Sequence, residues 1–102
     1  MPMLHTVNKS PFERNSLDAC LRLAKSGSSV LLIEDGVYAA TKGTVVADKV
    51  NKAMDGIKFY VLGPDVEARG ISPTHMIDGV QVVNYEGFVD LVAEHDSVHA
   101  WL

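Results

Sequence analysis

The sequence contains a single cysteine, Cys20, among 102 residues. One cysteine excludes a disulfide framework within the chain, which is the usual support of small secreted domains. No apolar run approaches the roughly 18 residues that span a bilayer. The opening MPMLHTVNKSP also lacks the charged start and long apolar stretch of a signal peptide. We therefore expect a cytoplasmic protein without a membrane segment.

Basic clusters and phosphate-binding loops are also missing. Nine Lys and Arg face thirteen Asp and Glu, giving a net charge of −4, and the basic residues are scattered. A nucleic-acid surface normally needs a basic patch, so direct binding of RNA or DNA is not expected. A nucleotide or flavin site needs a Gly-rich or Ser/Thr-rich loop after a strand, and neither NKSP (8–11) nor LGPD (62–65) is one. No organic cofactor is expected.

The segments that are present alternate between strand and helix patterns. This order predicts a single α/β domain over residues 1–102, with a mainly parallel sheet of about four or five strands flanked by helices. Active and binding sites of such folds lie beyond the carboxyl ends of the strands. The apolar tail SVHAWL is expected to pack or to add an edge strand. The predicted strands are 3–7, 29–34, 57–63 and 80–85, and the predicted helices are 16–26, a helix within 37–56 broken near Gly43, a short turn from Pro64, and 86–95.

Cys20 is the one candidate nucleophile, and it lies in the predicted helix 16–26. At about 100° per residue, Leu17, Leu23 and Ala24 fall close around it, so the thiol lies on the apolar face. Free cysteine there most often behaves as a small hydrophobic side chain. A reactive role needs a lowered pKa, and only the helix N-terminus about one turn away favours one. The pattern therefore favours burial and leaves a functional thiol as the alternative.

Acidic and histidine pairs give weaker signals. Glu34 and Asp35, at the end of a predicted strand, could bind Mg²⁺ or act as acid and base, but a capped turn is the favoured interpretation. His95 and His99 have the i, i+4 spacing of a zinc pair, yet the helix is expected to end near Asp96. His5 is expected to be a half-buried, hydrogen-bonded ring. No metal site is predicted.

Several segments in order resemble the DsrH/TusB family. They are MLHTVNKSP, LLIEDGVYAA, FYVLGPDVEARG, VNYEGFVDLVAEH and the closing AW, and together they extend along essentially the whole chain. The resemblance implies a DsrE-like fold and a heterohexamer with DsrE/TusD-like and DsrF/TusC-like subunits. It also implies a DsrC/TusE-like protein as downstream sulfur acceptor. The main sulfur-accepting cysteine would then lie in the DsrE/TusD-type partner, so the chain is not expected to be catalytic alone.

Cys20 also bears on which branch of the family the chain resembles. TusB-type members, whose complex serves 2-thiolation of the wobble uridine of transfer RNA, commonly lack a cysteine in the first helix. DsrH-type members, which serve oxidative sulfur metabolism, carry one. The resemblance therefore favours a DsrH-like subunit in which Cys20 carries persulfide sulfur or contacts the acceptor. The alternatives are a TusB-like, purely structural subunit and a stand-alone domain that binds a small molecule.

Overall fold

A five-stranded sheet forms the centre of the protein. The structure is a computed structural model that describes residues 3–13 and 15–102. The strand order is β4-β3-β2-β1-β5, and every neighbouring pair is parallel, which confirms the predicted α/β class. The strands are β1 (Met3–Val7), β2 (Ser29–Leu32), β3 (Lys58–Leu62), β4 (Gln81–Val83) and β5 (Ser97–Trp101).

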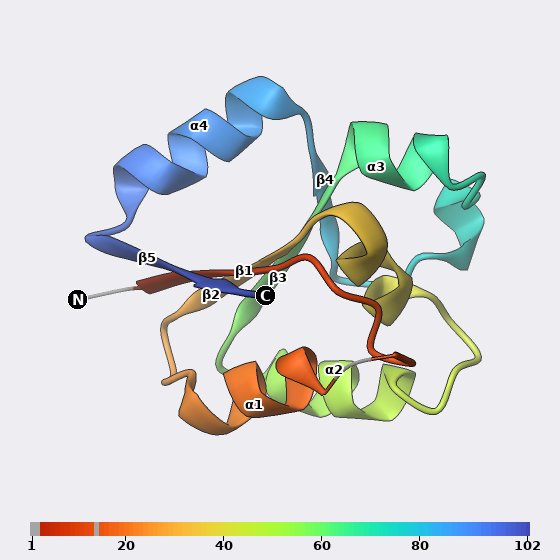
Figure 1. Ribbon diagram of the computed structural model, residues 1–102, viewed down its shortest axis with the longest axis horizontal. Helices are drawn as coiled ribbons and strands as arrows, with labels where there is room; N and C mark the ends of the chain where they lie inside the picture. Colours follow the sequence, from red (N-terminus) through yellow and green to blue (C-terminus); the bar gives the residue numbers. More distant parts are fainter. Residues whose placement is uncertain (1–2, 14) are drawn as a thin grey trace.

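Helices cover the sheet on both faces (Figure 1). Helices α1 and α2 lie on one face, and α4 lies on the other, as Figure 1 shows. Among the described residues, none of the helices combines the length and the apolar character that crossing a membrane requires. The α-helices are α1 (Ser16–Leu23), α2 (Ala47–Ala53), α3 (Gly63–Ala68) and α4 (Tyr85–Glu94), and the 3₁₀ helices are η1 (Glu34–Ala40) and η2 (Pro73–His75).

Several predicted elements differ in detail from those of the structure. The first helix ends at Leu23 rather than Ser26, because Ala24 is already extended, with φ −69° and ψ 131°. The second strand ends at Leu32, since the chain turns into η1 two residues later. The break near Gly43, whose φ is +76°, is confirmed, but the segment before it is the 3₁₀ helix η1 and not an α-helix.

The C-terminal tail adds the edge strand β5. It pairs in parallel with β1, so that Leu4 lies beside Val98 and Val7 beside Trp101. The indole Nε1 of Trp101 donates a hydrogen bond to Nδ1 of His5 at 3.0 Å. This bond ties the last strand to the first across nearly the full length of the chain.

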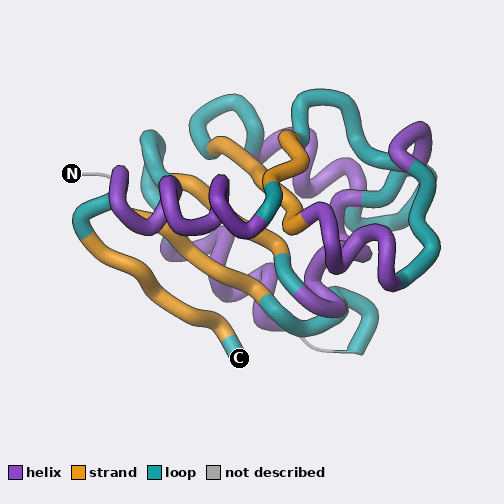
Figure 2. The backbone as a smooth tube through the Cα atoms, turned by 90° about the horizontal axis from the view of Figure 1, so that it is seen from above, coloured by secondary structure: helices purple, strands orange, loops and turns teal. Residues whose placement is uncertain are grey.

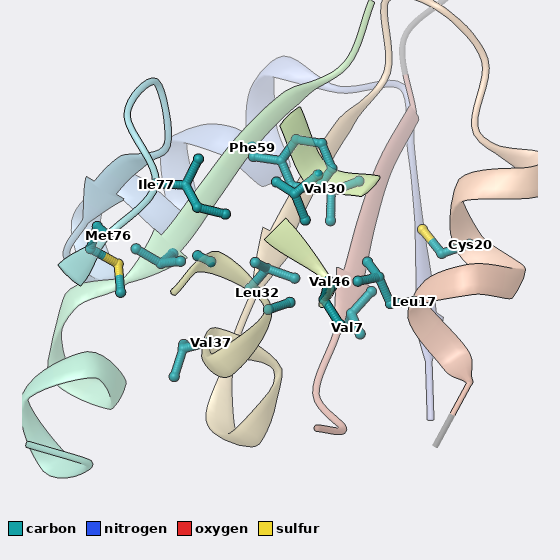
Figure 3. Packing of buried hydrophobic residues seen from close by; sticks show 14 of the residues in the cluster. Val7, Leu17, Cys20, Val30, Leu32, Val37, Val46, Phe59, Met76 and Ile77 are labelled. Atoms are coloured by element: carbon teal, nitrogen blue, oxygen red, sulfur yellow. The ribbon is translucent and has the colours of Figure 1, made fainter. Parts of the chain in front are cut away.

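The two faces of the sheet have cores of very different size. Sixteen buried residues from the sheet, α1, α2, η1, α3 and adjoining loops form one cluster that we call the α1–α2 core, and Figure 3 shows part of it. Under α4, the described hydrophobic residues Leu4, Leu31 and Leu91 form a smaller buried cluster, which we call the α4 core. The α1–α2 core consists of Val7, Leu17, Cys20, Val30, Leu32, Val37, Ala39, Ala40, Val46, Val50, Ile57, Phe59, Val61, Val66, Met76 and Ile77.

Candidate functional site

Helix α1 places Cys20 against the sheet. Cys20 and Leu17 are the buried residues of this helix, and Cys20 has no exposed surface. Figure 3 shows its side chain on the sheet side of α1. The prediction that Cys20 lies on the buried face is confirmed. Leu23, which was expected beside it, is instead 66% exposed, because it is the last residue of the shortened helix.

Burial sets the chemistry of this thiol. Removal from water raises the pKa of Cys20 to about 12. The thiolate is the nucleophilic form, so at neutral pH the side chain is held as an unreactive thiol. In this conformation of the isolated chain, Cys20 packs like an apolar residue.

The carboxyl edge of the sheet, where a site was expected, holds a network of paired charges. Arg69 Nε lies 2.9 Å from Asp35 Oδ1, and Asp65 Oδ2 accepts a 2.7 Å hydrogen bond from the backbone N–H of Glu34. Glu34 itself has a φ of +48°, which is unusual for a residue with a side chain. These contacts fit the favoured interpretation of a capped turn after β2.

The turn packs closely on β1. A Cβ atom at Gly36 would lie 2.1 Å from the carbonyl oxygen of Val7, so only glycine fits at this position. Beside it, the side-chain oxygen of Asn8 is buried without a hydrogen-bond partner among the described residues. At this turn, backbone packing of Gly36 against Val7 therefore closes the carboxyl edge beside β1.

The structure separates the histidine pair that had zinc spacing. His95 is held by the carbonyl oxygen of Leu91 at 2.6 Å and by the Ser29 hydroxyl at 2.9 Å. The ring of His99 instead stacks on Trp101, with centroids 4.4 Å apart. The two imidazoles thus have separate partners. Within residues 3–13 and 15–102, no three His, Cys, Asp or Glu side chains group as metal ligands.

His5 is hydrogen-bonded, as the sequence predicted, but it is buried rather than half-buried. Its side chain is 3% exposed, and its Nδ1 accepts the Trp101 hydrogen bond. Burial, followed by the nearby charge of His99, lowers the pKa of His5. A lowered pKa keeps the ring neutral at physiological pH, as its acceptor role requires.

A shallow hollow of about 460 Å³ lies at the opposite, amino edge of the sheet. Sequence reasoning missed it, because the rule for parallel sheets directs attention to the carboxyl edge. The hollow is open to solvent, and Leu23 and Lys25 on its rim are exposed. It is lined by Met3, His5, Leu23, Lys25, Ser26, Gly27 and Ser28.

Comparison with known proteins identifies the family. A family profile described as DsrH like protein matches residues 9–98. The chain belongs to this DsrH-like family. The resemblance of the ordered segments is thereby confirmed.

Curated relatives extend this membership over the full length. The chain is 38% identical to Protein TusB of Pectobacterium parmentieri, over 100 residues. It is 41% identical to Protein TusB of Erwinia tasmaniensis and 36% identical to Protein TusB of Escherichia coli K12, over 99 residues each. Each alignment covers 97% of this chain and 100% of the relative.

These names change the choice between branches of the DsrH-like family. The cysteine of the first helix favoured the DsrH-like branch, whereas the curated relatives at 36–41% identity carry the name TusB. The comparisons therefore favour the TusB-like alternative over the leading hypothesis. A single buried residue is a weak guide here, since a cysteine can occupy such a position for packing alone.

Solved structures support the fold of the DsrH-like chain. The ychN protein from E. coli superposes with a TM-score of 0.83 over 98% of both chains at 19% identity. A Methanobacterium thermoautotrophicum protein of unknown function, MTH1491, superposes with a TM-score of 0.75 over 97% of both chains at 16% identity. At these identities the likeness concerns the fold alone.

Proposed function

We propose that this chain is the TusB-like subunit of a sulfur-relay complex that serves 2-thiolation of the wobble uridine of transfer RNA. The observation that carries the proposal is the full-length match to relatives named TusB, together with membership of the DsrH-like family. Family membership supports a sulfur-relay subunit, and the relatives' names favour the thiolation branch. We place the protein in the cytoplasm, where TusC- and TusD-like subunits and a TusE-like acceptor would meet it.

In this proposal the chain assembles the complex and does not carry sulfur. The support is the position of Cys20, which is fully buried and whose pKa is raised to about 12. Sulfur transfer requires a thiolate that attacks the outer sulfur of a donor persulfide, forms Cys–S–SH and releases the donor as a thiolate. A neutral thiol inside the core cannot begin that step in this conformation.

Deletion and complementation test the thiolation role. Removing the gene from its host should abolish 2-thiouridine at the wobble position, measured by mass spectrometry of transfer-RNA nucleosides. The wild-type chain and Cys20→Ala should both restore it. Full thiolation in the deletion strain would contradict the proposal.

The second candidate is a DsrH-like subunit in oxidative sulfur metabolism, and the presence of Cys20 in α1 is what favours it. Here Cys20 would receive sulfur when a partner opens the α1 contact. Mass spectrometry after incubation of the intact complex with a persulfide donor distinguishes the two candidates. Addition of one sulfur atom to Cys20, with transfer lost in Cys20→Ser, would favour this candidate; an unmodified Cys20 would contradict it.

A further inference from the structure

Helix α4 exposes a stripe of apolar side chains on its solvent side. Tyr85, Val89 and Val92 recur at i, i+4 and i+7, which places them on one face of the helix. They are 61%, 67% and 41% exposed. Scattered apolar residues on a surface are ordinary, but a row of three along one helix forms a patch that suits an interface.

Strand β5 extends the patch at the edge of the sheet. Val98 lies in register with Leu4, whose side chain belongs to the α4 core, so Val98 faces the same side as α4. It is 46% exposed. Figure 2 shows β5 as the outer strand, alongside α4 and not covered by it. We call Tyr85, Val89, Val92 and Val98 the α4–β5 patch.

A row of acidic side chains borders this patch on α4. Glu86, Asp90 and Glu94 recur at i, i+4 and i+8, so three like charges lie along one line of the helix. Such spacing destabilises a helix unless a positive charge neutralises it. Among the described residues, every ion pair involves Lys42, Lys49 or Arg69, and none reaches this row.

The charge imbalance extends over the whole last third of the chain. All nine Lys and Arg precede Gly70, while residues 70–102 hold five acidic side chains. Those acids are Asp78, Glu86, Asp90, Glu94 and Asp96. The neutralising charge for the α4 row must therefore come from solvent ions, from the first two thirds of the chain, or from another molecule.

We infer that the α4–β5 patch and its acidic row form the docking site for a partner subunit whose contact face is apolar and bordered by Lys or Arg. This inference rests on the proposed function, because a sulfur-relay subunit needs partners. A two-fold dimer through the same surface would set acidic row against acidic row, which opposes a second copy as occupant. An anionic membrane surface would be repelled for the same reason.

The test uses the chain together with the TusC- and TusD-like subunits of its own organism. Val89→Ser removes apolar contact, and the double variant Asp90→Lys/Glu94→Lys reverses the charge. Val45→Ser is the matched control for the first, because Val45 is 85% exposed in the loop before α2. Asp48→Lys/Asp55→Lys is the control for the second, since these exposed acids belong to α2 and the turn after it and change the net charge equally.

Both α4 variants should raise the Kd of the chain for its partners at least about tenfold, which corresponds to about 1.4 kcal/mol. Both controls should stay within about twofold of the wild type. Binding of the wild type should weaken with added salt, and the charge-reversed variant should lose that dependence. Sedimentation and urea unfolding of each isolated variant confirm that the chain stays folded.

Different outcomes would contradict the docking site and the proposed function. If the wild type binds its partners and all four variants bind equally well, the docking site is wrong and the proposed function stands. If the wild type binds no such partner, the proposed function fails and the inference fails with it. A dimer of the chain alone that Val89→Ser disrupts would assign the patch to a second copy and overturn the inferred partner.

Discussion

The two faces of the sheet differ in the size of the hydrophobic cluster that each one buries. Among the described residues, the hydrophobic cluster that includes α1 and α2 holds sixteen buried residues, whereas the cluster under α4 holds three. Yet α4 is the longest α-helix of the structure, with ten residues. The thin core beneath it therefore reflects how little of its apolar surface points inward.

If the α4–β5 patch docks a partner as inferred, the difference separates the support of the fold from the surface used in assembly. Most of the stability of a small domain comes from apolar burial, and the α1–α2 core supplies the larger share. The α4 face keeps Tyr85 and Val89 outward, where they add little to the folded chain alone. Substitutions can test this division, beginning with the largest expected loss.

Phe59→Ala should cause the largest loss of stability. Phe59 lies on β3 within the α1–α2 core and is 1% exposed. Removing a buried aromatic ring leaves a cavity and costs about 3–5 kcal/mol. Urea unfolding followed by circular dichroism measures the change. Phe12→Ala, at a position 55% exposed, is the control and should lose far less; equal losses would refute the assignment of the core.

Leu91→Ala should destabilise the chain by a smaller amount. Leu91 joins Leu4 and Leu31 in the α4 core and is 5% exposed. We expect the free energy of unfolding to fall by about 2–3 kcal/mol, at the low end of the range for Leu→Ala. The loss is small because few residues surround Leu91, so that α4 can shift to fill part of the cavity. The same urea titration gives the value. A loss larger than that of Phe59→Ala would show that the α4 face, not the α1–α2 face, is the main support.

Much of this fold could be read from the sequence. The alternation of strand and helix patterns predicted the parallel sheet, and the apolar stripe of α1 predicted the burial of Cys20. The predicted boundaries were wrong where the backbone departs from regular periodicity. Glu34 is an example, because no residue pattern predicts its positive φ. The paired charges of Asp35 and Arg69 join positions 34 residues apart, so only the folded chain reveals them.

The α4–β5 patch, which we infer to be a docking site, was the least predictable feature. Val89 and Val92 look like core residues in the sequence, and the helical period cannot say which of two apolar arcs faces the sheet. The register of β5 on β1, which places Val98 beside Leu4, also comes only from the folded chain. Sequence patterns report burial well where one face of an element is apolar, and poorly where both are.

Cys20 provides a smaller, pH-dependent test of the α1–α2 face. Its pKa is about 12 in the folded chain and near 9 when exposed, so the unfolded chain ionises first. The contribution of Cys20 to stability is complete below pH 9 and is lost as pH rises from about 9 to 12, by at most about 1.4 kcal/mol per pH unit. Cys20→Ala should remove this part of the pH dependence, measured as the difference in unfolding free energy between the two chains at pH 8 and 10.

The labelling rate of the thiol gives an independent check. Slow reaction of the native chain with a thiol reagent, and fast reaction in urea, are expected of a fully buried side chain. An identical pH dependence in wild type and Cys20→Ala, or fast labelling of the native chain, would show that α1 leaves the sheet readily. The α1–α2 face would then be less firmly closed than its core suggests.

Val89→Ser should have the smallest effect on the isolated chain. Its side chain is 67% exposed on α4, and exposed substitutions away from special features change stability by about 0.5 kcal/mol or less. Urea unfolding of the isolated chain measures this, with Val45→Ser as the exposed comparison. The same Val89→Ser change is expected to weaken partner binding at least about tenfold. A loss of stability comparable to that of Leu91→Ala would mean that Val89 supports the fold. Its exposed side chain would then not be reserved for partner binding.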